Sequence, residues 1–125
     1  MKKKSSEHSD DKPILFHIQR EEALEIHHSS IGTVGKLFSG EGIEAVWVKK
    51  QSEEIDPDWF SQPMVDPILV AQGKLMMEFE RTDLMPCMLA PGDLVLLPPE
   101  TRCRAYRWPR EVKEATVFLA VYTVK

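Results

Sequence analysis

Asp66 is the most informative polar residue of this sequence, because its carboxylate could serve in acid–base catalysis or hold a ligand. Apolar segments flank it, and a lone carboxylate among apolar groups has a raised pKa unless hydrogen bonds satisfy it. Such a carboxylate suits a general base or a ligand anchor. The alternative is that Asp66, which precedes Pro67, only caps a turn.

The thiol of Cys103 has three candidate roles: metal ligand, nucleophile or small core residue. A cysteine nucleophile needs a pKa lowered by a neighbouring base or a helix N-terminus. The flanking Arg102 and Arg104 point to the opposite face of a strand, so they do not activate the thiol. The pattern therefore favours a core or pocket-lining role. By the same alternation Arg107 shares the face of Cys103, where its guanidinium would bind a carboxylate or phosphate.

Short strands must position these residues. β-branched or alternating segments bounded by Gly and Pro indicate a series of strands and no long helix. Gly73 separates two of these segments and predicts a hairpin, while residues 21–24 favour a short helical turn. The predicted strands cover 14–18, 33–38, 43–50, 67–72, 74–80, 83–90, 94–97, 101–108 and 115–124, which indicates an all-β barrel or sandwich.

Length and composition predict a single small domain. Of the 125 residues, 1–12 have no large apolar residue beyond Met1 and are expected to form a disordered tail before a domain at 13–125. The net charge of -4 argues against nucleic acid as a partner. No apolar run approaches the roughly 20 residues of a membrane span. The two cysteines form no disulfide framework, which favours a cytoplasmic protein.

The spacing of residues 60–73 is specific enough to suggest a family. It resembles the first motif of the cupin superfamily, in which His-x-His is followed after three or four residues by Glu and after six more by Gly. Here Phe60 and Gln62 occupy the histidine positions and Asp66 the glutamate position, while Gly73 matches the motif.

Residues 92–103 resemble the second cupin motif, Gly, five residues, Pro-x-Gly, two residues, His. Gly92 and Pro98 match, Glu100 stands in the place of the second glycine, and Cys103 stands in the place of the histidine. The resemblance covers about residues 43–122 and implies a double-stranded β-helix, or jelly-roll, barrel. Gly73 and Gly92 suit tight turns with positive φ whatever the barrel contains.

The resemblance implies four metal-ligand positions, and in this chain they are held by Phe60, Gln62, Asp66 and Cys103. Phe60 cannot ligate, and Asp66 and Cys103 are two ligands of mismatched hardness, so no metal and no other cofactor is expected. The expected function is therefore the binding of a small organic molecule by a metal-free barrel, and the resemblance also implies a homodimer. Its pocket for a small organic molecule is predicted to be lined by Phe60, Gln62, Asp66, Cys103 and Arg107.

Two alternatives remain open from the sequence. One is a divergent cupin enzyme, of isomerase, decarboxylase or dioxygenase type, that uses Asp66 with or without a metal. The other is a structural barrel that serves dimerisation or partner docking. The replaced ligand positions favour a binding protein over an enzyme.

Overall fold

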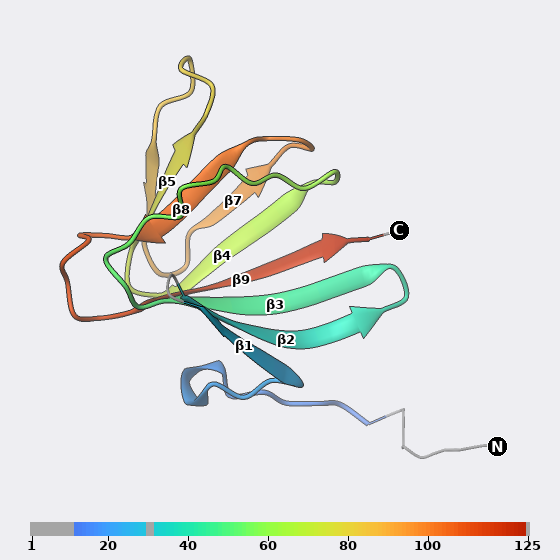
Figure 1. Ribbon diagram of the computed structural model, residues 1–125. Coiled ribbons are helices and arrows are strands. Elements are labelled where there is room, and N and C mark those ends of the chain that lie inside the picture. Colours follow the sequence, from blue (N-terminus) through green and yellow to red (C-terminus); the bar gives the residue numbers. More distant parts are fainter. Residues whose placement is uncertain (1–11, 30–31, 125) are drawn as a thin grey trace.

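The computed structural model describes residues 12–29 and 32–124, and its regular structure is almost entirely β-strand (Figure 1). A short 3-10 helix, η1, spans Ile18–Arg20. The strands are β1 (Glu25–Ser29), β2 (Gly32–Gly40), β3 (Ile43–Lys50), β4 (Asp66–Gln72), β5 (Leu75–Phe79), β6 (Cys87–Leu89), β7 (Leu94–Leu97), β8 (Cys103–Arg107) and β9 (Thr116–Thr123). The predicted all-β class is confirmed.

The strands form two antiparallel sheets. The larger has the order β1-β2-β3-β9-β4-β7, and the smaller has the order β6-β5-β8. In Figure 1 the larger sheet fans out below, and the smaller sheet lies above it with the long β5–β6 connection projecting away. The long crossovers, such as the one that places β9 between β3 and β4, are what bring residues distant in sequence onto one sheet face.

The hydrophobic core lies between the two sheets. The larger sheet contributes Val46, Ile68 and Phe118, and the smaller contributes Leu75 and Met77, all buried. These residues recur at every second position along their strands, which is the period that sends them all to one face. The alternation in the sequence therefore identifies the inner face of the larger sheet.

The predicted hairpin at Gly73 is wrong. β4 and β5 are consecutive strands but belong to different sheets, so Gly73 lies at a corner between the sheets rather than at a hairpin turn. Its φ is +71°, and a Cβ there would lie 2.8 Å from the carbonyl oxygen of Ala115. Only glycine accommodates both the left-handed backbone and this close approach. The positive φ expected at Gly73 and Gly92 is confirmed, with +93° at Gly92.

The predicted strand at 14–18 is also wrong. Ile14 and Leu15 are about three-quarters exposed, and no sheet neighbour pairs with them in the described part of the chain. The backbone turns instead through η1, which ends at Glu21 in a left-handed conformation. β-branched composition alone does not make a strand without a partner edge. Of the predicted disordered tail, residues 1–11 lie outside the described residues.

The segment around η1 covers the outer face of the larger sheet at Trp47. This indole is fully buried, and its Nε1–H donates a hydrogen bond of 2.9 Å to the carbonyl oxygen of Glu22. Lys49, two residues further along the same face, pairs with the carboxylate of Glu21 at 2.7 Å.

Across the described residues, no helix is both long enough and apolar enough to cross a membrane.

Candidate functional site

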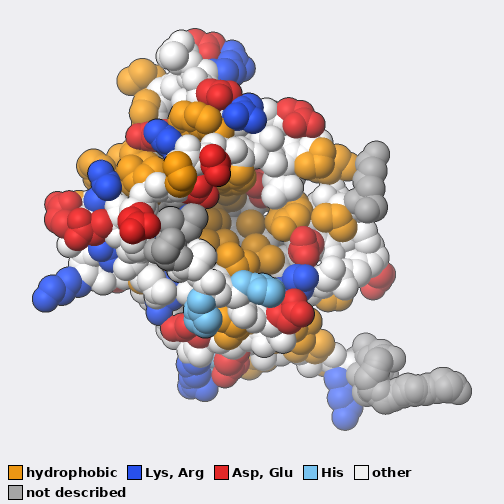
Figure 2. Space-filling view, in the orientation of Figure 1, with side chains coloured by type: hydrophobic (Ala, Val, Ile, Leu, Met, Phe, Trp, Pro, Cys, Tyr) orange, Lys and Arg blue, Asp and Glu red, His pale blue; other side chains and the backbone are white. Residues whose placement is uncertain are grey.

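The inner face of the larger sheet carries a cavity of about 330 Å³. Figure 2 shows the molecule hollowed here, with hydrophobic side chains at the base of the hollow and histidine side chains at one edge. Strands β2, β3, β4 and β9 supply the floor, and β8 and the 51–65 loop supply the opposite wall. The lining consists of Ser29, Gly32, Val34, Val46, Val48, Lys50, Asp56, Phe60, Gln62, Asp66, Ile68, Arg104, Ala105, Phe118, Ala120 and Tyr122.

Asp66 is the most unusual polar group of this cavity. As the first residue of β4 it points inward, it is only 4% exposed, and its Oδ1 has no hydrogen-bond partner among the described residues. Burial raises the pKa of this carboxyl because the charged form loses its hydration. An unpartnered buried oxygen is costly, so it marks a place where a hydrogen-bond donor is missing.

Two backbone contacts hold the wall next to Asp66. Phe60 and Cys103 exchange backbone hydrogen bonds of 2.9 Å in both directions, and the Glu100 N–H donates to the Gln62 carbonyl at 2.7 Å. Glu100 has a φ of +64°, the left-handed conformation that glycine adopts most easily. The residues matched to the two sequence motifs are therefore adjacent in space, although about forty residues separate them in the chain.

Three of the five predicted pocket residues line the cavity, namely Phe60, Gln62 and Asp66. Cys103 and Arg107 do not. Cys103 is fully buried in the core, and burial first, then the charge of Asp66, raises the pKa of its thiol to about 11. Such a thiol is a poor nucleophile at neutral pH.

Arg107 is held away from the cavity by the backbone of two loops. Its Nε–H donates to the carbonyl oxygen of Arg110 at 2.8 Å, and its Nη1 donates to the carbonyl oxygen of Gln51 at 3.1 Å. The side chain is 93% buried by these loops and ties them together. Strand alternation correctly places Arg107 on the inner face. Arg107 is the last residue of β8, however, and it lies beyond the cavity lining.

Lys50 and Arg104 line the cavity and were not among the predicted site residues. Burial lowers the pKa of the Lys50 ammonium, and the charge of Asp56 partly offsets that effect. The signal for Lys50 was in the sequence, because it lies at even spacing from Val46 and Val48 on the inner face of its strand.

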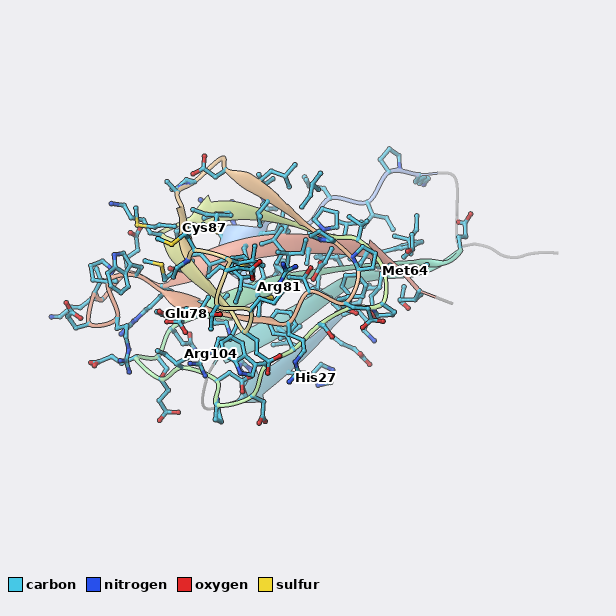
Figure 3. All side chains as sticks on the ribbon, turned by 90° about the horizontal axis from the view of Figure 1, so that it is seen from above. His27, Met64, Glu78, Arg81, Cys87 and Arg104 are labelled. Carbon is cyan, nitrogen blue, oxygen red and sulfur yellow. The ribbon has the colours of Figure 1, made fainter. Side chains whose placement is uncertain are left out.

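Arg104 reaches the cavity from the edge of the smaller sheet. Its Nε–H donates to Oε1 of Glu78 at 3.0 Å, and its guanidinium lies 4.3 Å from the centre of the Trp59 ring. Figure 3 shows Arg104 beside Glu78. The Tyr106 hydroxyl donates to the other oxygen of Glu78 at 2.6 Å, and this bond, more than Arg104, lowers the pKa of Glu78. No property of the sequence indicates that the guanidinium of Arg104 contacts both Glu78 of β5 and Trp59 of the 51–65 loop.

The four family ligand positions do not fit a metal ion. Phe60 offers no donor atom, and Cys103 is sealed in the core with a protonated thiol rather than facing the cavity. Within residues 12–29 and 32–124, no three His, Cys, Asp or Glu side chains come together in a group that could hold a metal. Asp66 and Gln62 alone supply too few ligands for a transition metal.

No family model matches the chain, and no curated protein matches it either. Solved structures do match. The cupin domain of Schizosaccharomyces pombe Cnp3 is 14% identical, with a TM-score of 0.65 over 82% of this chain and 69% of that one. A cupin-like protein from Thermotoga maritima is 21% identical, with a TM-score of 0.63 over 74% of this chain and 68% of that one.

A third structure has the same architecture. It is an RmlC-like cupin family protein with a double-stranded β-helix fold from Methanocaldococcus jannaschii, 14% identical, with a TM-score of 0.62 over 80% of this chain and 89% of that one. At such identities the likeness is one of fold, and function has to be argued from the site.

Proposed function

Because the chain has the cupin fold, a double-stranded β-helix, we propose that it works as a metal-free binding protein whose cavity holds a small organic molecule. The single observation that carries this proposal is the unpartnered Oδ1 of Asp66, which is buried in the wall of an otherwise largely apolar cavity. A ligand hydroxyl or amine that donates to this oxygen would replace the hydration that the carboxylate loses on folding.

The shape of the site supports a small organic ligand. A volume of about 330 Å³ falls at the lower end of the range typical of small-molecule pockets. Val46, Val48, Ile68 and Phe118 provide the apolar contact area, and Asp66 provides orientation. This combination of apolar walls with a few polar groups is typical of pockets that bind organic molecules.

The chemistry of Cys103 and Phe60 supports a site without a metal. Cys103 has a raised thiol pKa and contacts the core, and Phe60 lies along the cavity where the family places an imidazole. The phenyl ring adds apolar surface to the wall instead of a ligand atom. Phe60 is 38% exposed, so it lies at the edge of the site rather than at its base.

The test combines elemental analysis with native mass spectrometry of protein purified without a metal-affinity tag. We expect no stoichiometric transition metal and a co-purifying organic mass that is released on unfolding. The same spectra report the oligomeric state and so test the expected homodimer. A stoichiometric metal would overturn the metal-free proposal.

A pair of variants locates the ligand. Ala120 lines the cavity floor, and Ala120→Met would fill it, whereas Val121→Met alters the outer face of the same strand. We expect Ala120→Met to lose the organic mass and Val121→Met to keep it. Equal ligand content in both variants would place binding elsewhere, and no ligand in any sample would favour a structural barrel.

A further inference from the structure

The floor of the cavity is a ladder with a charged residue at each end. Lys50 of β3 pairs with Thr116 of β9 at one end. Two apolar rows follow, in which Val48 pairs with Phe118 and Val46 pairs with Ala120. All the β3 members line the same cavity, as even spacing requires.

Asp66 lies at the other end of this ladder. Ile68 of β4 pairs with Ala120 of β9, and two residues further along the antiparallel strands are Asp66 and Tyr122. Thr116 and Tyr122 are six positions apart on β9, which at about 3.3 Å per position is about 20 Å. The ammonium and the carboxylate therefore lie at opposite ends of an apolar floor, too far apart to pair with one another.

Neither end has a hydrogen bond or an ion pair with another described residue. Asp66 Oδ1 has no hydrogen-bond partner there, and the ion pairs between described residues include Lys49 but not Lys50. Asp56 acts on Lys50 through its charge, while no cation contributes to the pKa of Asp66. At the Asp66 end the Tyr122 hydroxyl is occupied, since it donates to Glu44 at 2.9 Å.

We propose that the ligand is an elongated amphipathic acid whose carboxylate binds Lys50, whose apolar chain covers the floor, and whose hydroxyl or amine donates to Asp66. This assignment rests on the proposed function, since it names the class of molecule that the cavity holds. Arg104 is a second cation on the lining, but it pairs with Glu78, so the preference for an anion rests on Lys50.

Other ligand classes match the ladder less well. An inorganic cation would pair with Asp66 but leave Lys50 unpaired, and an inorganic ion of either sign would leave the apolar rows in contact with water. A purely apolar molecule would bury the carboxylate of Asp66 without a donor, which costs free energy. A molecule with polar groups at its two ends and an apolar middle would provide a partner for Lys50, for the two apolar rows and for Asp66.

Isothermal titration calorimetry with three probes of equal chain length tests the assignment. The probes are ω-hydroxydecanoate and decanoate, both below their critical micelle concentrations, and decanol below its solubility limit. We expect ω-hydroxydecanoate to bind about tenfold more tightly than decanoate, because only the former donates to Asp66. Asp66→Leu should abolish this difference, and Asp66→Asn, which keeps an acceptor oxygen, should retain part of it.

Lys50→Met supplies the second comparison, since it removes the charge and keeps the apolar stem. It should weaken both acids about tenfold and leave decanol unchanged. Lys49→Met is the matched control, because Lys49 lies on the outer face and pairs with Glu21, and it should change none of the three affinities.

Two negative results have different meanings. If decanol binds as tightly as either acid and Lys50→Met has no effect, the assignment of an amphipathic acid is wrong, but the cavity remains a ligand site. If no probe binds and the purified protein carries no organic mass, the proposed function fails as well.

Discussion

Gly35 of β2 lies directly opposite Trp47 of β3, and the missing side chain of Gly35 makes the room that the indole occupies. A Cβ on Gly35 would overlap the atoms of the indole ring. The buried indole in turn holds the segment around η1 through its hydrogen bond to Glu22. This pair therefore fastens the N-terminal segment to the outer face of the larger sheet.

Gly35→Ala should destabilise the fold by about 2–4 kcal/mol, because the indole must leave its position and lose its packing. Gly40→Ala in the same strand is the matched control, since its Cβ would make only ordinary contacts with the Phe38 ring. Urea denaturation followed by tryptophan fluorescence measures both variants. Equal stabilities for the two variants would contradict the role of Gly35.

Asp66→Asn should show a distinct pH dependence of stability. The folded pKa of Asp66 is raised above 3.8, so the folded state keeps a proton that the unfolded state has already released. The stability of the wild type therefore falls as pH rises from about 3.8 through the folded pKa of Asp66, because ionising the buried carboxyl costs free energy. Well below pH 3.8 the carboxyl is protonated in both states and this penalty is absent. The free energy of unfolding of Asp66→Asn, relative to the wild type, should increase with pH in this window.

Urea titrations of both proteins at a series of pH values provide this comparison. The informative quantity is the slope with pH of the difference in unfolding free energy between the two proteins. Any cost of the new amide that does not depend on pH cancels in this slope. A flat difference between pH 4 and pH 8 would mean that Asp66 is not desolvated in the folded protein.

Glu78→Gln should show the opposite sign. The hydrogen bond from Tyr106, followed by Arg104, lowers the folded pKa of Glu78 below 4.5. The stabilisation is present above pH 4.5 and is lost as pH falls through the folded pKa. Because Glu78 and Arg104 are partly exposed, we expect an effect below about 1 kcal/mol at neutral pH. A larger relative loss of stability for Glu78→Gln at low pH than at neutral pH would contradict this.

The two cysteines should react slowly in the folded state and rapidly after unfolding. Burial raises the pKa of both thiols, and that of Cys103, which is fully enclosed, reaches about 11. Iodoacetamide labelling followed by mass spectrometry should therefore modify Cys87 first. A Cys87→Ala variant should take up label only in urea, and rapid native labelling of this variant would show that Cys103 is accessible.

Much of this architecture was predictable from local patterns. Alternating apolar residues at 43–50 predicted β3 to the residue, and the turn at Gly92 and the strand end before Pro98 were also correct. Glu100 explains why the second motif tolerates a change, since it adopts the left-handed φ without being glycine. The predicted hairpin at Gly73 was wrong because a turn residue indicates only the local backbone conformation, and it does not indicate which strand the next segment pairs with.

Local sequence patterns were enough to predict the strand periodicity, the turn positions and the family-like spacing that puts Asp66 and Cys103 near one another. The packing of the two sheets was needed to show that Asp66 faces a cavity while Cys103 faces the core. The same packing places Lys50 and Arg104, rather than Arg107, in the cavity lining. Alternation selects a face of a strand, whereas the crossovers and the 51–65 loop fix which residues lie opposite that face.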